Sequence, residues 1–168
     1  MSDKEPLSGV VLDITEATLE FRGPRFFVAL TLCLTRHLGL RFAFVAEKRL
    51  STSLGYTLAF ADAENIRHGS LSYDLSNLPC RTVLAGQAVN VPCNVAELYP
   101  GATSIASYCG LPLKSQTGEV MGILAVEDTK DFIAPERIER VLKAINPRVA
   151  AELELDRYRR GVQKVLTD

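Results

Sequence analysis

The feature that most constrains the fold of this chain is a pair of strand-like runs, Ser107 to Leu113 and Val120 to Asp128. The short polar segment Lys114 to Gly118 lies between them and joins them. Two apolar, strand-forming runs joined by a short segment that contains glycine are typical of a β-hairpin. The fold therefore contains adjacent antiparallel strands.

Earlier in the chain, three shorter runs alternate between apolar and other residues with the period of two that strands have. These runs cover Phe42 to Ala46, Leu54 to Phe60 and Leu71 to Leu75. Glu47 to Arg49 and Asn65 to Gly69 lie between them and suit turns. The pattern predicts a three-stranded antiparallel meander, and Gln87 to Val91 is a candidate edge strand.

Helical periodicity precedes the strand-rich region and interrupts it once. Helices are predicted over residues 7–21 and from Phe27 to Leu38, where Gly39 is a suitable residue just past a helix end. A short helix is expected from Pro79 to Ala85, because proline is favoured in the first helical turn.

The last helix is expected to start at Pro135 and to carry one apolar stripe. The stripe contains Ile138, Leu142, Ile145, Val149 and Leu153, and continues through Leu155, Tyr158, Val162 and Val165. Pro147 lies inside this pattern. Because its ring removes a helical hydrogen bond and clashes with the preceding turn, we expect the helix to bend there or to end near Ile145 and Asn146.

Length and composition indicate one ordinary globular domain. The chain has 168 residues, of which 47% are hydrophobic and 23% charged, enough for a single core without disulfide or metal support. A formal net charge of -1 gives no electrostatic basis for binding nucleic acid or an anionic membrane. No apolar run reaches the length of a membrane span, about 20 residues, and the N-terminus does not resemble a signal peptide, so we expect a cytoplasmic protein.

The pattern of cysteines and histidines does not indicate a metal site. The cysteines are Cys33, Cys80, Cys93 and Cys109, at wide and unrelated spacings, and we expect them to be free thiols. His37 and His68 have no second ligand at metal-binding spacing. We therefore predict no bound metal, and the sequence names no cofactor.

Three motifs, taken in order, resemble those of the GAF domain family. They are Tyr73 to Cys80, Ser107 to Leu113 and Gly118 to Asp128. The similarity covers about Pro24 to Arg157. It implies an α+β, three-layer α/β/α fold of the GAF/PAS type. In that fold a central antiparallel sheet of five or six strands has the N- and C-terminal helices on one face and a ligand pocket on the other.

The resemblance also implies a division of the chain. Residues 24–156 would form the GAF domain. Residues 1–23 would form an N-terminal helix available for a dimer contact, and residues 157–168 a C-terminal helical extension toward an output domain.

The chain departs from the family pattern at three points. Leu78 replaces a threonine that caps the short helix, a role for which Asn77 or Ser76 is a substitute. The loop between Tyr99 and Ser107 is shorter than in similar domains. The signature of cyclic-nucleotide-binding GAF domains is absent, so no cyclic nucleotide is predicted.

The resemblance places a small-molecule pocket near several aromatic and polar residues. The candidate ligand-binding residues are Phe60, Tyr73, Cys80, Arg81, Tyr99, Tyr108 and Asp128. Aromatic surface with a polar tip suits a small organic ligand, although packing in the core explains each aromatic residue equally well.

Four residues near this region each raise a question about chemistry. Cys80, at a helix start, is either a reactive thiolate or a small apolar residue packed under the helix, and we favour packing. Arg81 either helps to bind an anion or is simply exposed. Glu127 and Asp128 should point to opposite faces of their strand, so they form no acid-base pair, and Asp128 should accept hydrogen bonds in the following turn.

GAF domains are sensory modules that bind small molecules or dimerise and pass a signal to an output domain. The resemblance implies a non-catalytic, homodimeric sensor whose partner is an output such as a histidine kinase of a two-component system or a diguanylate cyclase. Residues 7–21 and the stripe from Ile138 to Val165 would carry the dimer contact. One alternative is a thiol-dependent enzyme similar to free methionine-(R)-sulfoxide reductase, which would use Cys80, Cys93 and Cys109. Another is a dimerisation scaffold without a ligand.

Overall fold

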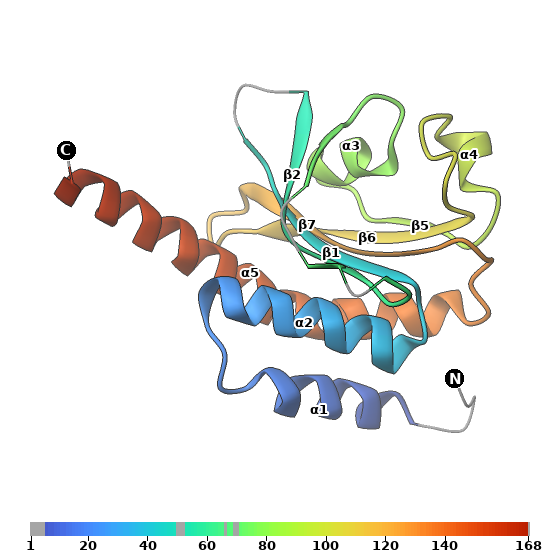
Figure 1. The fold of residues 1–168 in the computed structure, drawn as a ribbon, viewed down its shortest axis with the longest axis horizontal. Coiled ribbons are helices and arrows are strands. Elements are labelled where there is room, and N and C mark those ends of the chain that lie inside the picture. The colour runs from blue at the N-terminus through green and yellow to red at the C-terminus, as the bar shows by residue number, and fades with distance from the viewer. Residues whose placement is uncertain (1–5, 50–52, 66, 69–70, 168) are drawn as a thin grey trace.

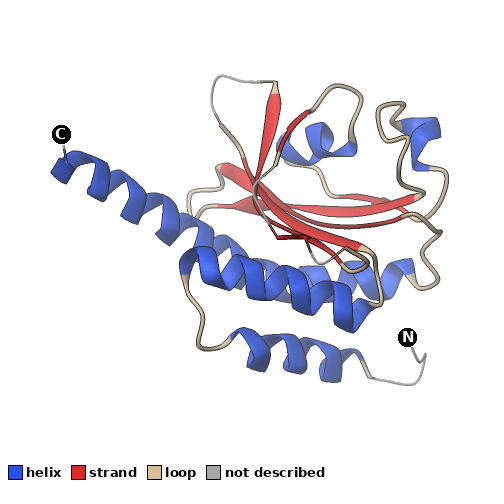
Figure 2. Cartoon of the chain, viewed as in Figure 1, coloured by secondary structure: helices blue, strands red, loops and turns tan. Residues whose placement is uncertain are grey.

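The computed structural model describes residues 6–49, 53–65, 67–68 and 71–167. Within them, an antiparallel sheet separates long helices on one face from short helices and loops on the other (Figure 1 and Figure 2). The helices are α1 (Leu7–Thr18), α2 (Gly23–Leu38), α3 (Pro79–Leu84), α4 (Val95–Leu98) and α5 (Pro135–Thr167). The strands are β1 (Phe42–Glu47), β2 (Leu54–Asp62), β3 (Arg67–His68), β4 (Ser72–Asp74), β5 (Val89–Val91), β6 (Ser107–Lys114) and β7 (Val120–Asp128). The predicted α+β, three-layer architecture is confirmed.

The strands of the described residues form one sheet in the order β3-β2-β1-β7-β6-β5, with β4 also paired to β2. Since β3 and β4 pair with opposite ends of β2 on the same edge, the described sheet is six strands wide. The β6–β7 hairpin, the meander and the edge strand β5 agree with the prediction. One detail differs, because Arg67 and His68, expected within a turn, pair with Ala61 and Asp62 as β3.

The short helices differ in part from the prediction. α3 begins at Pro79, as expected, and Gly86 follows it with a φ of 101°. No side-chain hydrogen bond caps α3 in the described part of the chain, so the expected substitution of Asn77 or Ser76 for the missing hydroxyl is wrong. The Ser76 amide is instead held by the Asp74 carboxylate at 2.8 Å. The short helix α4 was not predicted at all.

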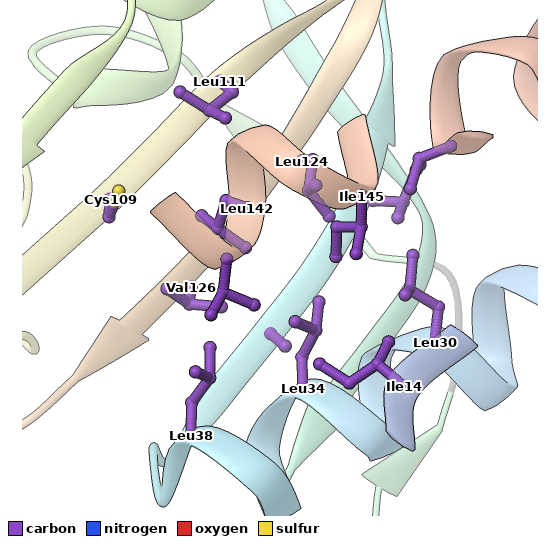
Figure 3. Close-up of a cluster of buried hydrophobic side chains, with 14 of the residues drawn as sticks. Ile14, Leu30, Leu34, Leu38, Cys109, Leu111, Leu124, Val126, Leu142 and Ile145 are labelled. Atoms are coloured by element: carbon purple, nitrogen blue, oxygen red, sulfur yellow. The ribbon is translucent and has the colours of Figure 1, made fainter. Parts of the chain in front are cut away.

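The two faces of the sheet support two separate hydrophobic clusters. Along β7, Leu124 and Val126 point toward α1, α2 and α5, whereas Ile123 and Ala125 point to the other face. Figure 3 shows the helix-side cluster, in which Leu34 of α2 and Leu142 of α5 face these strand residues. The face opposite the long helices is therefore the one on which the resemblance predicts a ligand pocket.

α5 is one continuous helix of 33 residues that passes through Pro147. Of the two expected outcomes, a bend at the proline or an end near Ile145 and Asn146, the end is therefore wrong. Pro147 lies on an exposed face, while Ile145 and Val149, on either side of it, are buried in the helix-side cluster. Packing on both sides of the proline outweighs the one hydrogen bond that its ring removes. Because Ile138 to Leu153 is buried against the chain's own sheet, only the later part of the stripe is exposed.

A buried acid connects the end of β1 to the later part of α5. The Glu47 side chain is only 7% exposed, and its carboxylate contacts Arg160 at 2.8 Å and Arg157 at 3.6 Å. Asp156 holds Arg160 from the same helix at 2.9 Å. These charge-assisted contacts fix the helix at the point where it leaves the core.

We expect Glu47→Gln to lower the free energy of unfolding by about 1–3 kcal/mol, because a neutral amide loses the charge-assisted bonds to Arg160 and the ion pair with Arg157. Residues 157–167 should also exchange their amide protons faster. Urea unfolding and hydrogen exchange measure the two effects. Glu20→Gln, an exposed position with no ion pair among the described residues, is the matched control and should shift stability by no more than about 0.5 kcal/mol. Equal losses in both variants would contradict the assignment.

Candidate functional site

A pocket of about 350 Å³ lies on the face of the sheet opposite the long helices. Strands β1, β2, β4 and β7, the start of α3 and the loop before β6 contribute its walls. Its lining consists of Phe44, Thr57, Phe60, Leu71, Ser72, Tyr73, Leu78, Pro79, Cys80, Gly101, Ala102, Ser104, Ile105 and Glu127. Larger hollows beside α1 and α5 contain none of the predicted site residues. The volume is at the lower end of the range for small-molecule sites.

Aromatic side chains form one wall of the pocket. Phe44 stacks on Phe60 with ring centroids 6.4 Å apart, and Tyr73 meets Phe44 edge-on at the same separation. The Tyr73 ring lies directly over Gly55, its partner across the β2–β4 pairing, where any added Cβ would overlap the ring. Glycine at position 55 is therefore required for this position of the ring.

The charged side chain that lines the pocket is Glu127, near the end of β7. Glu127 follows Ile123 and Ala125 at intervals of two residues, so all three side chains lie on the face of the sheet that carries the pocket. Among the described residues, none donates a hydrogen bond to its carboxylate or forms an ion pair with it. Burial raises the pKa of Glu127 to about 7.

Three more polar groups lie close to this carboxylate. The Tyr73 hydroxyl is buried without a hydrogen-bond partner among the described residues. The Cys80 thiol and the Tyr108 hydroxyl lie 3.5 Å apart. Burial, with the nearby Glu127 charge as a smaller cause, raises the pKa of Cys80 to about 12. Burial likewise raises the pKa of Tyr108 well above its ordinary value. The thiol is therefore protonated at neutral pH, which favours the packing interpretation of Cys80 over a reactive one.

Of the predicted site residues, Phe60, Tyr73 and Cys80 line the pocket, and Tyr108 lies against Cys80. Tyr108 is fully buried, and its ring covers Gly110 so closely that a Cβ there would overlap it. Sequence reasoning thus identified the aromatic and thiol side of the site.

The other three predicted residues lie outside the lining. The Tyr99 hydroxyl donates to the Thr82 hydroxyl at 3.4 Å, and Arg81 is exposed. The Asp128 carboxylate accepts hydrogen bonds from the amides of Arg41 and Lys130, as its predicted role in the turn requires. Position 128 faces away from the pocket because it is one residue out of phase with Glu127.

Glu127 is the functional candidate that sequence reasoning missed. The sequence does contain an indication of this role. Glu127 follows Ile123 and Ala125 at intervals of two, and an acidic residue in such a series of buried apolar residues is unusual in a strand. Only the register with the neighbouring strands decides which face that alternation takes.

An antiparallel sheet with long helices on one face and a pocket on the other is the architecture of an α+β domain of the GAF type. The profile of the GAF domain matches residues 18–153, and the chain belongs to this family. No described helix is long and apolar enough to cross a membrane. No group of three or more metal-binding side chains occurs in the part of the chain that the structure describes.

Solved structures of low sequence identity share the fold. The GAF domain of a phosphoenolpyruvate-protein phosphotransferase from Coxiella burnetii is similar with a TM-score of 0.74 and 17% identity, over 95% of this chain and 99% of that one. The GAF domain of the Acinetobacter phosphoenolpyruvate-protein phosphotransferase has a TM-score of 0.71 and 15% identity, over 94% and 98%.

Free methionine-R-sulfoxide reductase from Neisseria meningitidis, solved in complex with its substrate, is similar with a TM-score of 0.70 and 14% identity, over 94% of this chain and 95% of that one. At such identities the likeness shows the fold alone. No curated protein matches the chain.

The raised pKa of Glu127 predicts a dependence of stability on pH. The folded-state pKa, about 7, lies above the ordinary value of 4.5, so the folded chain holds the proton more tightly than the unfolded chain does. This contribution to stability is fully present below about pH 4.5 and is lost as the pH rises through about 7. Glu127→Gln stays neutral throughout, so its stability relative to the natural chain should increase by up to about 3 kcal/mol between acidic pH and pH 8.

Urea unfolding at about pH 5 and about pH 8 measures this difference. Glu97→Gln, which removes an exposed acid of α4 outside the pocket lining, serves as the control and should show no such widening. A stability difference between the natural chain and Glu127→Gln that is independent of pH would disprove the assignment.

Proposed function

We propose that this domain is a sensory or regulatory module that binds a small organic molecule in the Phe60–Tyr73–Glu127 pocket and controls a signalling output. The observation that carries the proposal is a pocket lined by a half-buried carboxylate, Glu127, and by a buried phenol hydroxyl, that of Tyr73, which has no hydrogen-bond partner among the described residues. Buried polar groups are costly to leave unpaired, so a ligand or ordered water that satisfies them stabilises the fold.

The route from the pocket to α5 passes along β1. Phe44 contributes to the pocket wall, and Glu47, three residues later in the same strand, pairs with Arg157 and Arg160 of α5. A ligand that binds two arrangements of β1 with different affinity would shift the population of two arrangements of α5.

We further propose a homodimer formed through the terminal helices, with a signalling partner such as a histidine kinase. Beyond Leu153, α5 exposes the apolar side chains of Leu155, Tyr158, Val162, Val165 and Leu166, and α1 exposes Leu12 and Leu19. Apolar residues that recur at helical spacing on an exposed helix favour pairing with another helix.

We expect Val162→Glu to raise the dissociation constant of the dimer at least about tenfold, because it places a charge in the proposed helix contact. Sedimentation equilibrium over a concentration series measures the constant. Gln163→Glu adds the same charge at the next exposed position and should change it by less than about threefold. A dimer that tolerates both substitutions equally would exclude this contact.

The proposed module is not an enzyme. The alternative function is that of a thiol-dependent reductase, and it is supported by the similarity in fold to the Neisseria protein. Cys80 and Cys109, however, belong to clusters on opposite faces of the sheet, and Cys93 is exposed. Catalysis by thiol exchange needs two sulfurs within bonding reach. Reduction of methionine-(R)-sulfoxide that is lost in Cys109→Ser would establish the enzyme instead.

A ligand screen with a blocked pocket tests the binding function. Ser104 is exposed at the pocket lining, and Ser104→Phe should fill part of the cavity. Compounds from a metabolite library that raise the Tm of the natural chain should raise that of Ser104→Phe by less than a quarter as much. Thr103→Phe, on an exposed neighbour outside the lining, should retain the full shift.

Native mass spectrometry of freshly purified protein complements the screen. A bound small molecule supports the sensor. If no compound stabilises the chain and no bound molecule is found, the sensor hypothesis is wrong and the ligand-free scaffold is the better interpretation.

A further inference from the structure

The distribution of charge around the pocket is one-sided. Glu127 is its charged lining residue, and the titratable groups that face it are Tyr73 of β4, Cys80 of α3 and Tyr108 of β6. Burial raises the pKa of each of these three groups, so all are neutral at neutral pH. None of the described residues that line the pocket is a lysine or an arginine.

Two arginines adjoin pocket elements, Arg41 beside the β1 partner of Glu127 and Arg81 beside Cys80, but neither lines the pocket. Arg41, which lies beside the end of β7, pairs with Asp62 at 3.4 Å and with Glu64 at 3.1 Å. Arg81 is exposed and does not line the pocket. The described lining of the pocket therefore contains a carboxylate but no positively charged side chain to neutralise it.

From this arrangement we infer that the ligand is a small organic cation, whose protonated nitrogen lies against Glu127 and whose apolar body lies against Phe44, Phe60 and Tyr73. The inference rests on the proposed function of the pocket and specifies the chemical class of its ligand.

Two physical effects favour a cation over a neutral or anionic ligand of the same shape. Glu127 is half-buried, so its carboxylate is only partly hydrated, and an ammonium or amidinium group restores both charge balance and hydrogen bonds. The faces of phenylalanine and tyrosine rings also attract a cation. An anion would meet the Glu127 charge in a poorly hydrated site and be repelled.

A metal ion fits the site poorly. Calcium and magnesium take six or more oxygen ligands, whereas the walls around Glu127 are largely apolar and contain no second carboxylate among the described lining residues. An organic cation needs only one carboxylate, and the buried Tyr73 hydroxyl supplies a second polar contact. A volume of about 350 Å³ limits the ligand to a small molecule with a compact apolar body.

Three probes with one shared body test the inference. 2-Phenylethylamine is a cation at pH 8, 2-phenylethanol is neutral and 3-phenylpropionate is an anion. Dissociation constants come from chemical-shift titration of the natural chain, Glu127→Gln and Glu97→Gln at pH 8. At this pH Glu127 is ionised, because its pKa is about 7.

We expect the natural chain and Glu97→Gln to bind the ammonium probe at least about tenfold more tightly than the alcohol, with the carboxylate weakest. In Glu127→Gln the preference for the ammonium should fall to less than about twofold. Equal binding of the alcohol or the carboxylate by the natural chain, or a preference that survives in Glu127→Gln, would overturn the inference. So would the failure of the ammonium probe to bind.

Ser104→Phe separates this inference from the proposed function. If the alcohol or the carboxylate binds best and Ser104→Phe abolishes that binding, the pocket is a ligand site and only the cation is wrong. If none of the probes and no library compound binds the natural chain, both proposals fail. Circular dichroism of each variant confirms that it is folded.

Discussion

The antiparallel pairing of β1 with β7, at the centre of the sheet, is the constraint on which the rest of the structure depends. Its register places Phe44 opposite Ala125 and Val45 opposite Leu124. From Ala43 to Ala46 and from Ile123 to Val126 the side chains alternate, so each strand supplies one residue in two to the helix-side core and the next to the pocket side. A slip of one residue would exchange Glu127 for Asp128 in the pocket and unpack both clusters.

The elements that could be predicted from the sequence are those whose formation depends on residues within or next to the element itself. The β6–β7 hairpin follows from two apolar runs and a short polar connection, and Gly39 ends α2 because its φ of 64° suits glycine. The errors have distant causes. Pro147 stays in α5 because packing partners on other elements hold the helix on both sides of it, and β3 forms because β2 offers an unpaired edge.

The same distinction applies to the site. Tyr73 and Cys80 belong to a recognisable motif, and their place beside the pocket was predicted from it. Glu127 was missed because its face depends on the register of strands more than 60 residues apart in the sequence. The positions of the Tyr73 and Tyr108 rings over glycines are equally invisible in the sequence, since each contact becomes definite only in three dimensions.

The unbroken course of α5 past Pro147 has a mechanical consequence. At 1.5 Å per residue, about 30 Å of rod separates Pro147 from Thr167. Because the proline leaves one backbone carbonyl without its usual donor, bending is easiest there. A tilt of about 5° at that point displaces the far end by about 3 Å over such a length. Between the two, the contacts of Glu47 with Arg157 and Arg160 fix the angle of the outer part of α5. Because these contacts lie halfway or further along the rod, a displacement of β1 would become up to about twice as large at the far end of the helix.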